Sequence, residues 1–324
     1  MIDHIKLKGQ STYFRDDLIQ CHKAGSTLYA DRKFDEEIDE AFDEIKYIIK
    51  FKTKKTWCRF YEKTNTASGE YQTDYNIWGS LHRFTSGKSY TDFHYPDIPN
   101  ALLKMCEECC FNISKHHQIM GIEIGVNITT HCDPDDYLTM FKLYWGAGFH
   151  EMRVLSGESR PHGIERVQSD LFKIKIYNKT VYSRKVEKLS PPKNKLRVEV
   201  QFMSRAIKDY ELPNTVQGLC DKVQFQKYVD KFCEIVKGIH MADWLYDISD
   251  LRGRDLRDYL LLHGDVRLYQ EYMRRIKGDR KAIELERRRY DRINALLAGR
   301  KTLKDEFIEK FDAKVRELML PKRV

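Results

Sequence analysis

Two glutamates, an asparagine and a tyrosine stand at alternating positions in three segments that are otherwise rich in isoleucine and valine. They are Glu123 and Asn127 in residues 119–129, Tyr177 in residues 170–178, and Glu199 in residues 195–203. Alternate residues of a β-strand share one face of a sheet. If the three strands pair, their apolar side chains form a core, and the four polar residues share the other face with Lys173, Lys175 and Arg197.

This set of side chains has the composition of a site that cleaves phosphodiesters with a metal ion. Two carboxylates and a neutral ligand suit a hard divalent ion such as Mg²⁺ or Mn²⁺. A metal ion that polarises a phosphodiester lowers the cost of the charge that develops on its oxygens. A tyrosine hydroxyl can then attack phosphorus and keep the DNA end as a covalent ester, while Lys or Arg offsets the phosphate charge. The alternative is an antiparallel sheet whose outer face is solvated and carries mixed charges.

Strand-like and helix-like segments alternate through residues 1–205. The predicted strands, bounded by turn residues, are Glu44–Phe51, Thr56–Glu62, Tyr71–Trp78, Ile119–Thr129, Gly148–Leu155, Asp170–Asn178 and Lys195–Met203. The predicted helices are Ile98–Phe111 and Asp133–Trp145, the second with Asp133 as N-cap and Pro134 at its first position. Several strands with few helices between them predict an α+β fold with an antiparallel sheet and helices packed on one side.

The C-terminal part of the chain is helical in pattern and carries the whole excess of positive charge. Helices are predicted at 214–240, 255–277, 280–297 and 303–318. The formal net charge is +8, and residues 251–324 hold 21 Lys and Arg against 13 Asp and Glu. A basic block suggests a polyanion partner such as nucleic acid, although Arg and Lys also suit a solvated helix face. We expect two domains, residues 1–205 and residues 206–324.

Composition also sets the expected compartment. The chain is 41% hydrophobic and 33% charged, the profile of a globular protein. No apolar run approaches the roughly 18–20 residues of a membrane span, and Met1–Ile5 lacks the basic flank and apolar stretch of a signal peptide. Cys106, Cys109 and Cys110 have no second pair to complete a zinc site. We expect a cytoplasmic protein with reduced cysteines and no membrane contact.

Four short segments resemble motifs of rolling-circle replication initiators, in the order those families have them. The segments are GSLHRF (79–84) leading to TDF (91–93), IEIGVN (122–127), FKIKIYNK (172–179) and LRVEVQF (196–202). They are similar to GSLHK…NDF, EFGVNI, IYNK or IYDK, and R-x-E in the Rep_trans-type plasmid initiators and the gene II-like phage and plasmid replication proteins. The resemblance covers residues 79–203, and the C-terminal helices match only in general character.

The resemblance implies an enzyme of a bacterial phage or plasmid that nicks and joins DNA at a replication origin. Tyr177 would be the nucleophile that nicks one strand, leaving a 5′-phosphotyrosine and a free 3′-hydroxyl that primes synthesis. Lys179 and Arg197 would be placed for phosphate, and Lys173 and Lys175 would contact DNA. The implied fold is the ferredoxin-like sheet of the HUH endonucleases. A relaxase or transposase would use the same chemistry, and a noncatalytic nucleic-acid-binding protein is the alternative of a different class.

The resemblance also implies a metal site. Glu123 and Glu199 would be its carboxylates, with Asn127 as a further ligand and His82, which lies in a matched motif, as a ligand or phosphate contact. The ion would be Mg²⁺ or Mn²⁺. The chain departs from the HUH group because no His-hydrophobe-His triplet occurs in it, which leaves the histidine ligand unassigned.

Several other residues are weaker candidates. Tyr182 could serve as a second catalytic tyrosine, although it would lie on the opposite face if the strand of Tyr177 continued. His162 and Glu165 precede that strand and could join the metal site. The pair at 116–117 ends a helix and is expected to cap it or to be exposed.

In the helical half, basic residues are expected to hold origin DNA while the sheet domain nicks it. They are Arg252, Arg254, Arg257, Arg287 and Arg288, accompanied by Arg274, Arg275 and Arg289. Tyrosines 259, 269, 272 and 290 accompany them at helical spacing and are expected to pack rather than to stack on bases. The alternative for this half is protein contact, for example with a host helicase or with a second copy of the chain.

Overall fold

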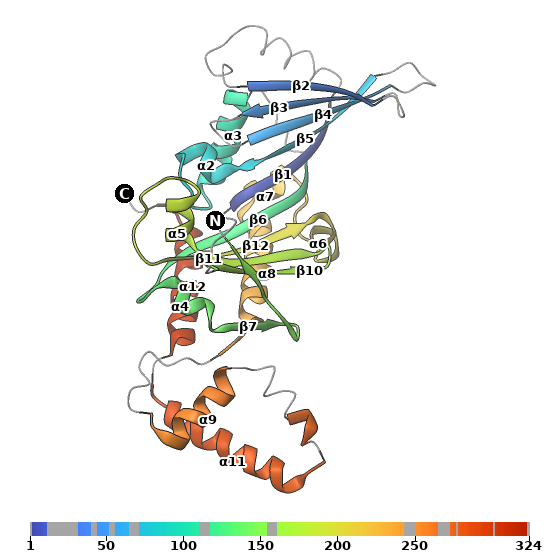
Figure 1. The fold of residues 1–324 in the computed structure, drawn as a ribbon. Helices are drawn as coiled ribbons and strands as arrows, with labels where there is room; N and C mark the ends of the chain where they lie inside the picture. The colour runs from blue at the N-terminus through green and yellow to red at the C-terminus, as the bar shows by residue number, and fades with distance from the viewer. Residues whose placement is uncertain are drawn as a thin grey trace.

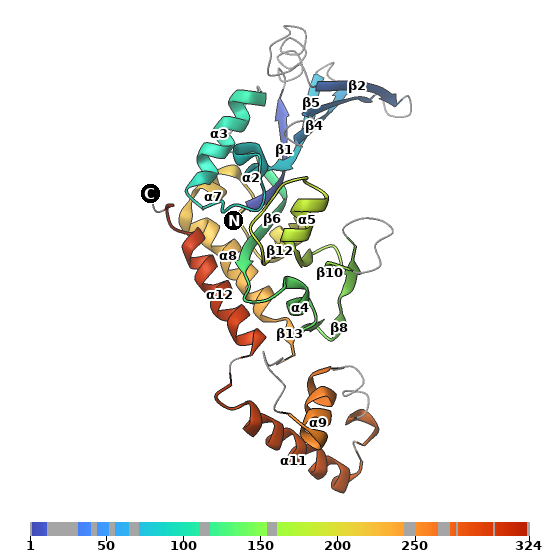
Figure 2. The same ribbon diagram turned by 60° about the vertical axis from the view of Figure 1, so that its left-hand side comes forward.

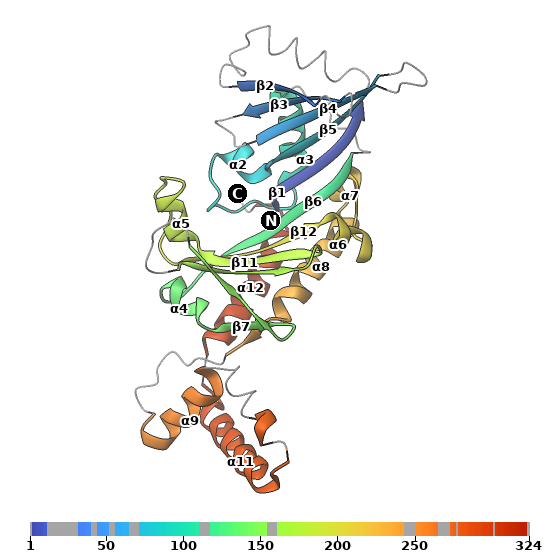
Figure 3. The same ribbon diagram turned by 45° about the vertical axis from the view of Figure 1, so that its right-hand side comes forward.

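In the described part of the chain, ten strands form one antiparallel sheet. The computed structural model describes residues 2–11, 32–39, 44–51, 56–64, 71–109, 117–153, 161–242, 251–264, 273–276, 278–300 and 302–322. The strand order is β2–β3–β4–β5–β1–β6–β12–β11–β10–β9, and Figure 3 shows the strands in this succession. Their bounds are β1 Ile2–Ser11, β2 Arg32–Asp39, β3 Glu44–Phe51, β4 Thr56–Thr64, β5 Tyr71–Ser80, β6 Gln118–Thr129, β9 His150–Met152, β10 Gly163–Gln168, β11 Phe172–Asn178 and β12 Lys195–Met203. With its helices, this sheet makes the chain an α+β protein.

One face of the sheet is apolar and is covered by helices α3 (Asp97–Cys109), α8 (Lys222–Lys237) and α12 (Leu303–Leu318), which Figure 2 shows along one side of the strands. The alternating Ile and Val residues of β6 and β12 lie in the same buried cluster as Phe232 of α8 and Phe307 of α12. Burial of this apolar area is the main driving force for the packing. The predicted alternation of β6, β11 and β12 is therefore confirmed.

The opposite face of the sheet carries α5 (Lys179–Lys185), which begins directly where β11 ends. Asn178 is the N-cap of this helix, and its side-chain oxygen accepts a hydrogen bond from the amide of Val181 at 3.1 Å. The chain thus turns from strand to helix at one residue. Because β11 does not continue past Asn178, the condition that would place Tyr182 on the opposite face of the strand is not met, and Tyr182 lies in α5.

Three strands of the sheet were absent from the predicted set: β1, β2 and β10. The predicted strands 44–51, 56–62 and 71–78 are confirmed by β3, β4 and β5, which follow one another as antiparallel neighbours. β1 lies at the centre of the sheet between β5 and β6. Its sequence, IDHIKLKGQS, mixes apolar with charged residues from its start, so its alternation is less regular than that of β6.

The predicted helix at 133–145 is wrong in its second half. Asp133 caps and Pro134 begins α4, but α4 ends at Leu138 and the chain continues as β7 (Phe141–Tyr144) and β8 (Ala147–Gly148). Trp145 and Gly146 form the turn between these strands with φ of 47° and 74°, as a two-residue type I′ hairpin requires. Apolar residues at 137, 140, 141 and 144 fit a helical period as well as a hairpin, so periodicity alone cannot separate the two.

The C-terminal helices divide between two cores. Helix α7 (Val216–Cys220), α8 and α12 pack in the main core with the sheet, whereas α9 (Gly253–Gly264) and α11 (Arg280–Leu297) form a small core of their own around Tyr259 and Ile293. Figure 1 shows α9 and α11 beyond the end of the sheet. A boundary at residue 205 therefore does not separate two cores, and the functional division between the two halves stays a prediction.

The predicted helix at 214–240 is interrupted at Asp221, which caps α8, and the predicted helices at 280–297 and 303–318 are confirmed by α11 and α12. The helices that the structure describes include none with the length and apolar character needed to span a membrane.

Candidate active site

The registers of three strands arrange the polar face in rows. From β11 through β12 to β6, the rows are Lys173–Gln201–Glu123, Lys175–Glu199–Gly125 and Tyr177–Arg197–Asn127. Tyr177 therefore lies one row from Glu199, and the two glutamates lie in neighbouring rows on neighbouring strands. The sequence prediction that these residues share one face is confirmed.

A third carboxylate, that of Asp3, joins the two glutamates. One oxygen each from Asp3, Glu123 and Glu199 lies within 4.8 Å of the others, and all three residues are buried. Asp3 comes from β1, where the register with β6 shifts between Ile2 and His4. The bulge leaves Asp3 as an extra residue and turns it to the polar face. Regular alternation would have placed it on the same side as Ile5, which is in the core, so sequence pattern gave no sign of its role.

Two cations neutralise these carboxylates, the partly buried Lys175 and the buried Arg197. Lys175 Nζ lies 2.5 Å from Glu123 Oε2 and 2.9 Å from Glu199 Oε2. The Arg197 guanidinium bonds Asp3 Oδ2 at 2.8 Å, Asn127 Oδ1 at 3.0 Å and the carboxylate of Glu199. The network therefore balances most of its charge internally, as buried ion pairs require.

The pKa values of the three carboxyl groups shift in different directions, because the two cations do not act equally on all three groups. Burial and the neighbouring Glu199 raise the pKa of Glu123 to about 7, although Lys175 opposes the change. Burial also acts to raise the pKa of Glu199, but Lys175 and Arg197 outweigh it and lower the pKa to about 2. Burial of Asp3 is likewise outweighed by Arg197, which holds the pKa of that carboxyl well below its ordinary value. Near neutral pH, Glu123 is thus the member that most readily holds a proton.

The tyrosine hydroxyl points into this network. Tyr177 is 5% exposed, and its hydroxyl donates a hydrogen bond to Glu199 Oε1 at 2.8 Å. Burial and the charge of Glu199 raise the pKa of Tyr177 well above its ordinary value. Tyr182 of α5 lies beside it, with ring centroids 5.3 Å apart. Both tyrosines, with Asp3, Glu123 and Glu199, line a cavity of about 240 Å³.

Lys179 also lines this cavity, and its side chain is buried. Its Nζ donates to Ser89 Oγ at 2.6 Å and to Glu187 Oε1 at 3.2 Å, and it stands 4.7 Å from the ring centroid of Tyr182. Burial and the nearby Arg197 lower the pKa of Lys179 to about 8. Glu187 also binds Arg83, which lines the cavity. Sequence analysis gave neither residue a role: Arg83 lies in the GSLHRF segment but was not singled out there, and no motif or alternation marks Glu187.

Two predicted ligands lie beside the carboxylates but are engaged elsewhere. Asn127 accepts from Arg197 through its oxygen and donates to the carbonyl of Thr91 at 3.1 Å. A ring nitrogen of His82 lies 2.9 Å from Thr91 Oγ1, and its ring stacks on Phe93. Burial lowers the pKa of His82 to about 3, so the ring is neutral. The third carboxylate beside Glu123 and Glu199 is that of Asp3, and neither Asn127 nor His82 belongs to this group.

Of the weaker candidates, Tyr182 lines the cavity, whereas His162, Glu165 and His117 do not. His162 Nδ1 lies 2.9 Å from Asp135 Oδ2, and Glu165 pairs with Lys173 at 2.7 Å. His117 is buried, so the expectation that it is exposed is wrong, and the alternative that it caps a helix stays a prediction. Residues 110 and 116 and tyrosines 269 and 272 lie outside the described residues, as do the side chains of Cys106 and Cys109.

The arginines of the helical unit fall into two groups. Arg289 and Arg292 bind the buried Asp258 and hold α9 against α11. The others are exposed: Arg252, Arg254, Arg257, Arg274, Arg275, Arg287 and Arg288. Arg257 is 73% exposed and Arg288 is 75% exposed. The five arginines predicted to contact DNA are thus all at the surface, and of the accompanying tyrosines Tyr259 packs whereas Tyr290 is exposed.

The donor set fits a hard divalent ion. Three carboxylates within reach of one another offer the oxygen ligands that Mg²⁺ and Mn²⁺ prefer. Two of these carboxylates, those of Glu123 and Glu199, also bind the Lys175 ammonium. An ion at this position would therefore compete with Lys175.

Comparison with known proteins adds little. No protein-family model and no curated protein matches the chain. The rolling-circle replication initiator protein from Geobacillus stearothermophilus is similar in structure over 78% of this chain and 89% of its own, with a TM-score of 0.34 and 10% identity. DynU16, from the dynemicin biosynthetic locus, is similar over 62% of this chain and 86% of its own, with a TM-score of 0.15 and 9% identity. TM-scores of this size do not establish a shared fold.

Gly125 provides the space that Glu199 and Arg197 occupy. A Cβ on Gly125 would lie 2.8 Å from Glu199 Cγ and 2.9 Å from the carbonyl oxygen of Val198. We predict that Gly125→Ala displaces these side chains and lowers stability by about 1–3 kcal/mol, as overpacking does, measured by urea denaturation. Gly121→Ala on the same strand is the control, because its nearest neighbour would be 3.4 Å away. Equal effects of the two substitutions would contradict the assignment.

The raised pKa of Glu123 predicts a pH-dependent stability. Its neutral form is favoured in the folded state, so its contribution is complete below about pH 4.5 and is lost as pH rises through about 7. Without divalent ions, the stability of the wild type relative to Glu123→Gln should fall by roughly 1–3 kcal/mol between pH 5 and 8. Urea denaturation at several pH values tests this. The control is Glu165→Gln, at a carboxylate that pairs with Lys173. A stability difference between the wild type and Glu123→Gln that does not depend on pH would refute the raised pKa of Glu123.

Proposed function

We propose that this protein is a metal-dependent, site-specific DNA endonuclease and strand transferase that starts rolling-circle replication. The observation that carries the proposal is the hydrogen bond from the Tyr177 hydroxyl to Glu199, inside a cavity that also holds Asp3 and Glu123. Phosphodiester cleavage needs a nucleophile that is hydrogen-bonded to a carboxylate, in a site whose side chains can bind a hard ion. The order of the four motif segments supports the same activity.

In the proposed reaction, the Tyr177 oxygen forms a bond to phosphorus and the bond from phosphorus to the 3′-oxygen breaks. The proton of Tyr177 passes to the carboxylate group, where Glu199 accepts the hydrogen bond and Glu123, with a pKa of about 7, readily holds a proton. The products are a 5′-phosphotyrosine and a free 3′-hydroxyl. A bound Mg²⁺ or Mn²⁺ would supply stabilisation of charge on the phosphate oxygens.

The cations of the site have distinct proposed roles. Lys179, with a pKa of about 8, is mostly protonated near neutral pH and can give a proton to the leaving 3′-oxygen. Lys175, which now pairs with Glu123 and Glu199, would be free to contact phosphate if these carboxylates bound a metal ion instead. Arg197 is 3% exposed and bonds three protein side chains, so it supports the carboxylates, and the predicted phosphate contact of Arg197 does not fit its burial.

The ferredoxin-like arrangement of the HUH group is proposed for the part of the sheet that holds the site. The adjacent antiparallel strands β6, β12 and β11, with helices on the apolar face, support it. A role for Tyr182 as a second catalytic tyrosine is compatible with its position beside Tyr177. Tyr182 is also less buried than Tyr177.

A noncatalytic nucleic-acid-binding protein is the second candidate, and one observation favours it. Lys175 and Arg197 already neutralise the carboxylates, so the network can be stable without an ion. A protein of this kind would bind single-stranded DNA but never cut it. A relaxase or a transposase would share the proposed chemistry and differ in the DNA that it acts on.

Incubation with single-stranded origin DNA and Mg²⁺ or Mn²⁺ tests the proposal. Wild type should form a covalent protein–DNA adduct, and Tyr177→Phe should abolish it, because the attacking oxygen is gone while the buried ring remains. Tyr182→Phe is the matched control, from the neighbouring ring of the same cavity, and should retain the adduct. Mass-spectrometric mapping of the DNA-bearing peptide identifies the tyrosine. Cleavage that is unchanged in Tyr177→Phe would sink the assignment, and binding without cleavage under either ion would favour the noncatalytic protein.

The exposed arginines of α9 and α11 are proposed to contact DNA phosphates. We expect the double change Arg257→Gln and Arg287→Gln to weaken DNA binding and to reduce the slope of log K against log salt by about 1.4–1.8, or about 0.7–0.9 for each phosphate that is no longer neutralised. Fluorescence anisotropy over a range of salt concentrations measures this slope. Arg205→Gln, at an exposed arginine on α6 (Ser204–Asp209) that pairs with Asp170, should leave it unchanged. A slope that the double change does not alter would assign this unit to protein contact.

A further inference from the structure

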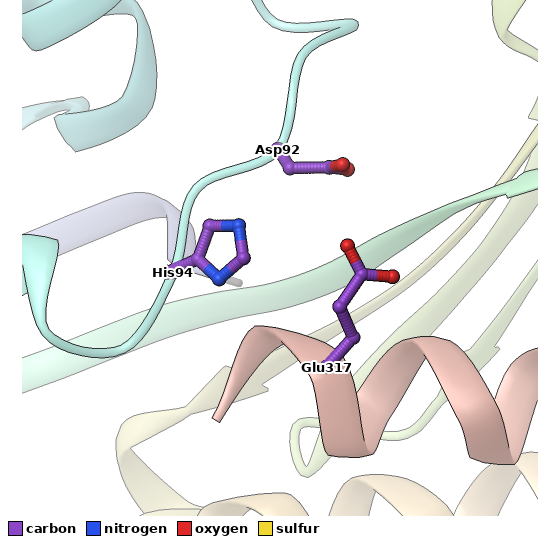
Figure 4. A group of neighbouring side chains, drawn as sticks. All are labelled: Asp92, His94 and Glu317. Carbon is purple, nitrogen blue, oxygen red and sulfur yellow. The ribbon is translucent and has the colours of Figure 1, made fainter. Parts of the chain in front are cut away.

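A second group of metal-ligand side chains lies outside the cavity of Tyr177. Asp92 and His94 come from the loop before α3, and Glu317 comes from the last turn of α12. One ligand atom from each lies within 4.8 Å of the other two. Figure 4 shows the two carboxylates and one ring nitrogen of His94 turned toward a common space.

The tautomer of His94 is fixed by its own hydrogen bond. Nδ1 lies 2.9 Å from the carbonyl oxygen of Leu320, and a carbonyl can only accept, so Nδ1 carries the proton. Nε2 of the neutral ring then presents a lone pair. His94 is 5% exposed, and within the described part of the structure Nε2 has no hydrogen-bond partner. A histidine that donates through one nitrogen to a backbone carbonyl and aims the other at two carboxylates has the arrangement of a metal ligand.

The two carboxylates are already arranged around a cation. Lys314 Nζ lies 2.7 Å from Asp92 Oδ2 and 3.0 Å from Glu317 Oε2. The backbone around them is fixed, because the amide of Tyr95 donates to the carbonyl of Leu318 at 2.7 Å. The ammonium satisfies the carboxylates but leaves Nε2 of His94 without a donor. A divalent ion would satisfy all three.

We propose that Asp92, His94 and Glu317 bind a divalent transition ion of the Zn²⁺ class. One imidazole nitrogen with two carboxylate oxygens suits Zn²⁺ better than Mg²⁺ or Ca²⁺, which prefer oxygen ligands alone. The site is thus distinct in chemistry from the three carboxylates around Lys175. The inference does not depend on the proposed nicking activity.

The ion would join the loop at 89–95 to the end of α12. This loop holds parts of the candidate active site, since Ser89 accepts from Lys179 and Thr91 contacts both His82 and Asn127. An occupied site would therefore stabilise the loop through ligands that come from distant parts of the chain. Its expected effect is on stability and on the order of the loop.

Titration of the full-length protein with Zn²⁺ by calorimetry, in saturating Mg²⁺ that fills the carboxylate group, tests the proposal. The wild type should bind one Zn²⁺, and Glu317→Gln should weaken this binding by at least about 10–100-fold, the loss that removal of a mere outer-shell partner causes. His94→Gln should do the same, because its amide can still donate to Leu320 but offers no ring nitrogen. Glu317 is 53% exposed, so folding of that variant is not at risk.

Lys314 supplies an opposite prediction at the same site. Lys314→Gln should tighten Zn²⁺ binding, because the competing ammonium is gone, and should enlarge the rise in Tm on adding Zn²⁺. Lys310→Gln, one turn earlier on α12 and paired with Glu306, is the matched control and should change neither. No Zn²⁺ binding in the wild type would overturn the proposal. So would Zn²⁺ binding of equal strength in wild type, Glu317→Gln and His94→Gln, which would assign the ion to other residues such as the cysteines.

Discussion

The buried guanidinium of Arg197 is the interaction on which the candidate site depends. It is bound by Asp3 of β1, Asn127 of β6 and Glu199 of its own strand. One charged group on the polar face of the sheet thus links three neighbouring strands by hydrogen bonds and ion pairs. Removing one partner of such a buried pair leaves an uncompensated charge, at a cost of about 3–5 kcal/mol. The positions of the carboxylates and the stability of the sheet are therefore set by the same contacts.

Lys175 gives the site a different property. It lies between two carboxyl groups whose pKa values differ widely. They differ because the charges of Lys175 and Arg197 act unequally on the two groups. A buried acidic group of this kind must always hold some cation, either an ammonium, a proton or a metal ion. If a metal ion replaces the ammonium or the proton, as the proposed function requires, pH, salt and metal concentration would be coupled variables.

The sequence predicted the part of the site that lies on regular strands. Tyr177, Glu123 and Glu199 each follow strict alternation with Ile or Val, and register then brings them together. Asp3 could not be found in this way, because a β-bulge reverses the side to which it points. Glu187 could not be found either, since it contacts Lys179 and Arg83 of the cavity from a loop that also bonds Ser89.

The same distinction holds for the fold. Helices with caps and long amphipathic faces, such as α11 and α12, were predicted within a residue or two, because local signals set their ends. Strand β7 of the β7–β8 hairpin was predicted as helix, since its apolar spacing serves either structure and Trp145 is an unusual residue for a left-handed turn position. The packing of α8 and α12 on the sheet follows from core contacts that composition does not reveal.

Asn178, which ends β11 and caps α5, has a consequence for how the strand of Tyr177 varies among chains. Its amide nitrogen donates to Asp133 at 3.2 Å and to Asp135 at 3.0 Å. The resembling families carry either Asn or Asp after the tyrosine. In this chain an aspartate at 178 could still cap the helix, but it would lose both donated bonds and face two carboxylates. The identity of this residue and the acidic pair at the start of α4 should therefore covary, and chains with Asp at the position are expected to lack the pair.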